Sequence, residues 1–169
     1  MTTSLRLESG VAGARAGLLV LGIDYAWIGL VQNRAGVHLA CRRMATAQAE
    51  DTIADDTMPR HPLDSTEGSP TVSVRATTDR VGLVRFSWSI DDRATWHRIA
   101  QPFQAAPGQW IGAEIGLFAC APVRADRQRN EESQGSAVFH AVEFAIKPVS
   151  DEGTLLWPEH LWAASRLVR

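Results

Sequence analysis

GQWIGAEIGLF, residues 108–118, is the stretch of the sequence that most clearly specifies a β-strand. Its apolar residues include aromatic and β-branched side chains, which fit a pleated, half-buried surface. Gly112 and Gly116 interrupt them, and a glycine inside a strand often marks the close approach of another backbone or a large ring. Pro107 and Gly108 supply turn chemistry just upstream. The pattern predicts a central β-strand with two glycine contact points, and by itself it indicates no chemistry.

Alternating apolar and polar residues predict further strands on both sides of this stretch. Residues 16–31 hold two apolar runs, which we expect to be strands joined at Gly22-Ile23-Asp24, because glycines disfavour a helix here. Similar runs occupy residues 37–41, 71–77, 82–90, 95–103 and 136–146. About eight short strands without intervening helices are typical of an all-β antiparallel sandwich.

The length of 169 residues suits one domain. Residues 1–15, with Gly10 and Gly13, are expected to form a loose leader, and residues 16–148 the β-sandwich domain. Residues 45–70 are interpreted as a long acidic loop and residues 124–135 as a polar loop. In the tail, residues 149–169, Pro158 is well placed to begin a short helix.

Composition restricts the classes of partner. Hydrophobic residues make up 45% and charged residues 21% of the chain, as in a soluble globular protein. A net charge of -2 and a pI near 6.2 disfavour nucleic acid or an anionic membrane as a partner. The sequence shows no signal-peptide pattern, so a cytoplasmic location is the default expectation. Cys41 and Cys120 lie in apolar runs and are expected to be buried thiols rather than a disulfide.

No catalytic constellation stands out in the sequence. The five histidines fall in different elements and never at the i, i+4 spacing of a helical metal site. The acidic loop does not match a calcium-binding loop, and neither a phosphate-binding loop nor a nucleophile elbow is present. We therefore predict no catalytic residue, no metal site and no cofactor.

The aromatic residues are the more informative group, because six tryptophans are many for this length. Trp88 and Trp96 flank the Asp91-Asp92 turn, and aromatic faces beside carboxylates commonly hold sugar rings. The alternative is that these tryptophans belong to the core. The candidate carbohydrate-binding residues are Trp88, Asp91, Trp96, Phe118 and Arg124.

Three segments together resemble a known family. They are AGLLVLGIDYAWIGLV (16–31), VSVRATTDRVGLVRFSWSIDDRATWHRIAQPF (72–103) and GQWIGAEIGLFA (108–119). They are similar to the C-terminal concanavalin A-like sandwich of glycoside hydrolase family 43 β-xylosidases. Phe86, Ser87, Ser89 and Asp91 match its F-S-x-S-x-D-G hairpin, Trp96 fills the following aromatic position, and residues 110–118 match its G-x-W-I-G-A-x-x-G-L-F strand.

The chain also departs from the family pattern. Asp92 stands where the hairpin usually has glycine. Val138 and His140 replace two aspartates of the family's last strand, so a cation-binding role is not carried over to them. The family sandwich begins some strands before the position of Ala16, and we therefore expect a jelly-roll that is incomplete at its N-terminal edge and recruits a partner or a second copy.

The resemblance implies a non-catalytic accessory domain, or a remnant of one, of a β-xylosidase- or arabinosidase-like hydrolase. Such a domain supports a catalytic propeller, and the loop 119–135 is the best candidate for a segment that closes the substrate pocket. A free-standing lectin-like carbohydrate-binding module is the alternative. The expected partners are a catalytic propeller or a second copy of the chain, with a xylo-oligosaccharide as a further ligand candidate.

Overall fold

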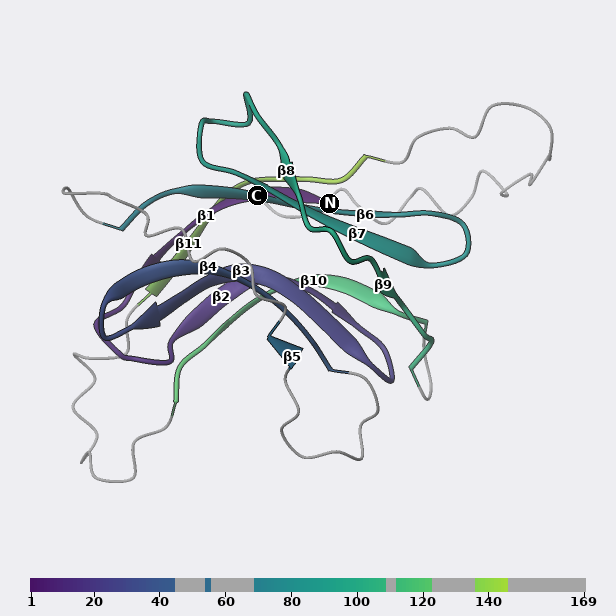
Figure 1. The fold of residues 1–169 in the computed structure, drawn as a ribbon, viewed down its shortest axis with the longest axis horizontal. Coiled ribbons are helices and arrows are strands. Elements are labelled where there is room, and N and C mark those ends of the chain that lie inside the picture. Colours follow the sequence, from purple (N-terminus) through teal and green to yellow (C-terminus); the bar gives the residue numbers. More distant parts are fainter. Residues whose placement is uncertain (45–53, 56–68, 109–111, 123–135, 146–169) are drawn as a thin grey trace, which may run out of the picture.

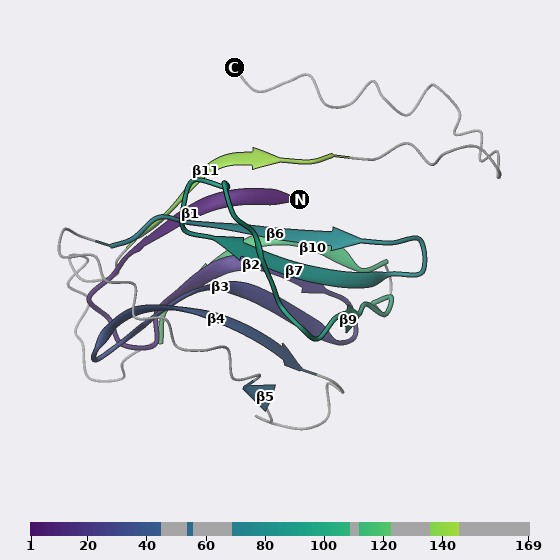
Figure 2. The same cartoon turned by 45° about the horizontal axis from the view of Figure 1, so that its top comes forward.

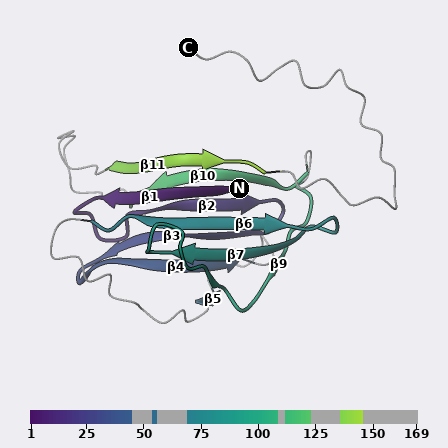
Figure 3. The same ribbon diagram turned by 90° about the horizontal axis from the view of Figure 1, so that it is seen from above.

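A computed structural model of the chain describes residues 1–44, 54–55, 69–108, 112–122 and 136–145. These residues form two antiparallel sheets that lie face to face (Figure 1). The strands of the two layers run in nearly the same direction, as in an aligned β-sandwich (Figure 3). The predicted all-β, two-sheet architecture is confirmed. No helix in the described part of the chain is long and apolar enough to cross a membrane.

The five-stranded sheet has the order β10-β2-β3-β4-β5. Its members are β2 (Arg15–Leu21), β3 (Tyr25–Asn33), β4 (Gly36–Met44), β5 (Ala54–Asp55) and β10 (Glu114–Cys120). β2 and β3 form the predicted hairpin, in which the Gly22 N–H donates to the Asp24 carbonyl at 2.9 Å. This sheet is arched, and its hollow side faces away from the other sheet (Figure 1).

The six-stranded sheet has the order β11-β1-β6-β7-β8, and β9 also pairs with β7. Its members are β1 (Thr2–Glu8), β6 (Val72–Thr78), β7 (Leu83–Ser89), β8 (His97–Arg98), β9 (Phe103–Gln104) and β11 (Ser136–Glu143). The single strand expected over residues 95–103 is therefore replaced by two two-residue strands.

The prediction of a loose leader over residues 1–15 is wrong for β1. This strand lies between β11 and β6 and is hydrogen-bonded to both (Figure 2). Thr3, Leu5 and Leu7 are buried at every second position, which is the period of a strand with one face in the core. Gly10 and Gly13 belong to the connection that leads to β2. The expectation of an unpaired N-terminal edge is wrong for the same reason, because β1 fills that place.

The prediction that residues 108–118 form a central strand is also wrong. β10 begins at Glu114 and lies at the end of the five-stranded sheet, paired only with β2 among the described strands. A side chain added at Gly112 or Gly116 would meet nothing within 4 Å, so neither glycine is a close contact point. The strand resembles a buried one because it carries apolar residues on both faces: Ile115 packs on the core, whereas Phe118 lies on the outer face.

The main core lies between the two sheets. Leu18, Ile28, Leu30 and Phe86 are almost completely buried there, as is Leu5 of β1. These side chains come from alternate positions of their strands, which explains why the alternation predicted most of the elements. The proposed tail helix, and most of the expected acidic and polar loops, lie outside the described residues.

Candidate functional site

The outer face of the five-stranded sheet is built from rows of residues that the strand register places side by side. One row runs Cys120, Arg15, Val31 and His38 across β10, β2, β3 and β4. The next rows on the same face are Phe118, Gly17, Gly29, Ala40 and then Gly116, Leu19, Trp27, Arg42. Because side chains alternate between the faces, all three rows point away from the core.

Trp27 is the centre of an aromatic and cationic cluster on this face. Its ring meets the Phe118 ring edge to face, with centroids 5.2 Å apart. The guanidinium carbons of Arg15 and Arg42 lie 5.8 and 5.9 Å from the ring centroid, a cation–π distance. Phe118 belongs to the adjacent row, which contains Gly17 and Gly29, and Arg15 belongs to the row beyond it, so the indole reaches Arg15 across these two glycines. Trp27 is only 3% exposed, so its role is to hold the neighbouring side chains in place rather than to stack on a ligand.

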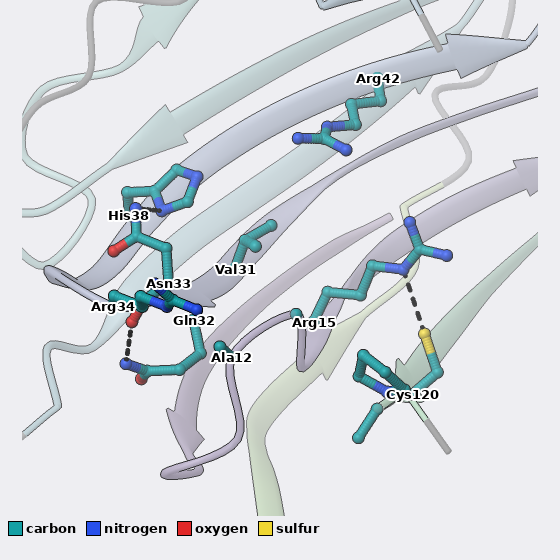
Figure 4. Close-up of a pocket in the computed structure, with 12 residues that line it drawn as sticks. Ala12, Arg15, Val31, Gln32, Asn33, Arg34, His38, Arg42 and Cys120 are labelled. Atoms are coloured by element: carbon teal, nitrogen blue, oxygen red, sulfur yellow. Dashed lines mark hydrogen bonds between the residues drawn. The ribbon is translucent and has the colours of Figure 1, made fainter. Parts of the chain in front are cut away.

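A pocket of about 790 Å³ opens beside this cluster. Arg15, Arg42, His38 and Val31 stand around it on the sheet face (Figure 4). The other described lining residues are Ala12, Gly13, Gln32, Asn33, Arg34, Cys120, Ala121 and Pro122. Arg34 lies in the β3–β4 turn, whereas Ala121 and Pro122 begin the segment that leaves β10. The volume falls within the range of small-molecule sites.

Hydrogen bonds fix the polar wall of the pocket. Asn33 accepts from the Ala35 N–H at 2.7 Å through Oδ1, and its Nδ2 lies 3.2 Å from Nδ1 of His38. The Gln32 amide donates to the Asn33 carbonyl at 2.8 Å. Arg15 donates through Nε to Sγ of Cys120 at 3.2 Å. The site therefore offers cationic and amide donors. No group of three His, Cys, Asp or Glu residues able to hold a metal occurs among the residues described.

The structure does not bring the five predicted carbohydrate-binding residues together. Trp88 lies in the main core at 6% exposure, where its ring stacks on His97 with centroids 4.4 Å apart. Trp96 lies beside the six-stranded sheet, where the guanidinium carbon of Arg75 is 3.6 Å from the centroid of its ring. Phe118 lies on the outer face of the other sheet, next to Trp27. Arg124 is outside the described residues.

Asp91 has a structural role in the turn after β7. Its Oδ1 accepts from the Ser89 hydroxyl at 2.6 Å and from the Thr95 N–H at 2.9 Å. The Ser89 Oγ also accepts from the Arg93 N–H at 3.0 Å. These bonds hold a turn in which Asp92 and Arg93 have positive φ angles of 54° and 72°. Glycine adopts a positive φ angle at less cost than aspartate, so Asp92 leaves this turn less relaxed than the glycine usual in the family hairpin.

These hydrogen bonds make the turn sensitive to acid. The Ser89 hydroxyl, followed by the Thr95 N–H, holds the pKa of Asp91 well below its usual range. A lowered pKa in the folded state means that ionised Asp91 contributes stability above the ordinary carboxyl pKa of about 3.9. That contribution is lost as the pH falls below this value. We expect the gap in urea midpoint between the wild type and Asp91→Asn to shrink as the pH is lowered from about 5 to about 2.

The control for this prediction is Asp92→Asn, which removes the same charge from the same turn. In the described part of the chain the Asp92 carboxylate accepts no hydrogen bond, so this variant separates the loss of a charge from the loss of the hydrogen bonds that Asp91 accepts. An Asp91→Asn gap that does not change with pH would contradict the assignment of these bonds.

The cysteines correct one further expectation. Neither forms a disulfide, as predicted, but Cys120 is exposed at the pocket rather than buried. Cys41 is half-buried and packs against the core. The difference follows from β10 being an edge strand, in which an apolar run does not imply burial on both faces.

Two antiparallel sheets packed face to face, one of them arched, define the class of this protein as a concanavalin A-like sandwich. Comparison with protein families identifies the branch of that class. The chain belongs to the family of β-xylosidase C-terminal concanavalin A-like domains, whose model matches residues 1–145. The match includes β1, which lies within the residues expected to form a loose leader. No curated protein matches the chain significantly.

Solved structures share this fold. The xylan β-1,4-xylosidase of Bacillus halodurans C-125 superposes with a TM-score of 0.59 at 14% identity over 82% of this chain and 26% of that one. A GH43 glycoside hydrolase engineered for endo-xylanase and exo-arabinofuranosidase activity superposes with a TM-score of 0.56 at 17% identity, over 82% of this chain and 27% of that one. A bifunctional GH43-CE protein of Bacteroides eggerthii superposes with a TM-score of 0.57 at 21% identity, over 82% of this chain and 16% of that one. The chain thus spans about a quarter or less of these proteins.

Proposed function

We propose that this chain is the accessory β-sandwich domain of a GH43-type β-xylosidase or arabinosidase, in which it packs on a catalytic propeller and supports its substrate pocket. The observation that carries this proposal is the family match over residues 1–145, because the family is defined by the C-terminal domain of β-xylosidases. The structural matches agree with it, since each covers most of this chain but a minor part of a larger GH43 protein.

The geometry suggests which part of the domain takes this role. The segment proposed to close a substrate pocket begins at the end of β10, where Ala121 and Pro122 line the pocket on the outer face. Pro122 is fixed there by the β1–β2 connection: a side chain at Gly13 would lie 2.7 Å from its ring. The segment therefore leaves from an anchored point beside a cavity, which is a suitable base for a loop that reaches another domain.

The test is whether the chain associates with a catalytic domain. A GH43-type catalytic domain encoded in the same or the adjoining reading frame should be produced with this chain and purified through a tag on one of them. We expect a 1:1 complex in analytical ultracentrifugation. If the two do not associate, and this chain alone binds xylo-oligosaccharides, the lectin-like alternative replaces the accessory role.

A further inference from the structure

We propose that the pocket on the outer face of the five-stranded sheet binds a small carboxylate-bearing molecule. The first observation is the charge of its wall. Arg15, Arg34 and Arg42 line it, and none of its described lining residues is acidic. The chain as a whole carries a net charge of -2, so this concentration of arginine does not reflect a generally basic protein. Glu114 and Asp24 lie at the opposite end of the sheet, with Glu114 beside Leu21.

The second observation is that Arg15 is held in position before any ligand arrives. Trp27 lies against its guanidinium, and Nε donates to Sγ of Cys120. Within the described part of the chain, its two terminal amino groups have no hydrogen-bond partner. A guanidinium fixed through Nε and open at its outer edge offers parallel N–H donors, the geometry that a carboxylate accepts bidentately. Because the side chain is already ordered, binding costs less entropy.

The third observation is the mixed character of the other walls. Val31, Ala12 and Pro122 supply apolar surface, whereas Gln32 and Asn33 supply amide groups. A bare inorganic anion would use only the arginines. An organic molecule would place its carboxylate on the arginines and its carbon skeleton on the apolar wall. The pocket volume of about 790 Å³ leaves room for a body of monosaccharide or disaccharide size.

Calorimetry on the full chain tests this proposal with a matched pair of ligands. Glucuronate and glucose differ only at C6, where glucuronate has a carboxylate and glucose a hydroxymethyl group, so we expect glucuronate to bind about tenfold or more tightly than glucose. Citrate serves as a carboxylate without a sugar ring, and inorganic phosphate as an anion without a carbon skeleton. Tighter binding of glucuronate than of citrate assigns the site to sugar acids, and the reverse order assigns it to simple carboxylates. Both results support the proposal.

Variants locate the binding. Arg15→Gln and Arg34→Gln should each weaken the carboxylate ligand about tenfold. Arg80→Gln, which removes an exposed arginine from the β6–β7 turn of the other sheet, should leave binding unchanged. Equal binding of glucuronate and glucose would overturn the proposal. Phosphate binding as tight as that of the carboxylates, or an equal loss in Arg80→Gln, would overturn it as well.

Cys120 provides a second measurement that needs no bound ligand. It is exposed and lines the pocket, so its alkylation reports the local charge. We expect the rate ratio of iodoacetate to iodoacetamide at Cys120 to exceed the ratio for free cysteine by about tenfold, because the arginines attract the anionic reagent. Because Arg34 lies in a turn, Arg34→Gln leaves the sheet intact. This substitution should lower the iodoacetate to iodoacetamide rate ratio, and added salt should lower it as well. A ratio equal to that of free cysteine would overturn the proposal.

Discussion

Gly29→Ala should destabilise the sandwich severely, by about 3 kcal/mol or more, because overpacking against a backbone has no inexpensive relief. An added Cβ at Gly29 would overlap the backbone carbonyl oxygen of Ala16 and lie 2.6 Å from Cα of Gly17. These atoms belong to the paired strand β2 and cannot rotate away as a flexible side chain would. Gly17→Ala should behave in the same way, because its Cβ would overlap the Ile28 carbonyl.

Gly116→Ala is the matched control. It makes the same substitution on β10 of the same sheet, where nothing lies within 4 Å, and its stability should stay within about 0.5 kcal/mol of the wild type. Urea denaturation followed by tryptophan fluorescence measures both variants. Equal midpoints for Gly29→Ala and Gly116→Ala would show that β2 and β3 do not approach as closely as the structure describes.

The second large effect is expected in β1. Leu5 is fully buried between the two sheets, so Leu5→Ala removes a core side chain and leaves a cavity. Such substitutions typically cost about 2–5 kcal/mol. Glu8→Ala, at the exposed end of the same strand, removes a surface ion pair with Arg6 and an exposed hydrogen bond from the Ser136 hydroxyl, and should cost about 1 kcal/mol or less.

Urea midpoints for the two variants distinguish a core strand from a loose leader. A strand hydrogen-bonded on both sides transmits the loss to the whole sheet, so unfolding should remain cooperative at a lower midpoint. If Leu5→Ala costs no more than Glu8→Ala, β1 is not part of the core.

Most strands could be predicted from the sequence because they bury one face and alternate accordingly. β3 and β7 show this pattern plainly, and the Gly22 to Asp24 turn specifies its hairpin. β1 was missed although Thr3, Leu5 and Leu7 carry the same period, because the run is short and begins with a polar residue that is buried through a hydrogen bond. Burial of Thr3 depends on the His140 carbonyl of β11, which no local pattern reveals.

The order of strands within a sheet could not be predicted from local patterns. The apolar residues on both faces of β10 favour a central position in the sheet, but its actual position depends on which strand pairs with β2. The same limit hid the candidate site. Arg15, Trp27, Arg42 and Cys120 come from four strands, and only the register places them on one face. The signal that could reveal part of it is the register of the predicted β2–β3 hairpin, because its extension to β4 places Arg42 beside Trp27.

The candidate site differs in kind from the one that the sequence suggested. Sequence patterns favoured Trp88 and Trp96 because they flank an acidic turn, yet Trp88 is in the core and Asp91 is occupied in holding that turn. The outer face of the five-stranded sheet instead combines a buried tryptophan, positioned arginines and a cavity. It lies where the chain leaves β10, at the start of the segment proposed to close a substrate pocket.

The accessory role is tested most directly by the rate at which a catalytic domain hydrolyses an aryl β-xyloside with and without this chain. A GH43-type catalytic domain encoded in the same or the adjoining reading frame should be assayed alone and with the chain at equimolar concentration, and the chain should also be assayed by itself. We predict no turnover above the uncatalysed rate for the chain alone. Its addition should raise kcat/KM of the catalytic domain about tenfold, equivalent to about 1.4 kcal/mol of transition-state stabilisation. An unchanged kcat/KM would contradict the accessory role, as would turnover by this chain that survives repurification and disappears when one of its own carboxylates is replaced.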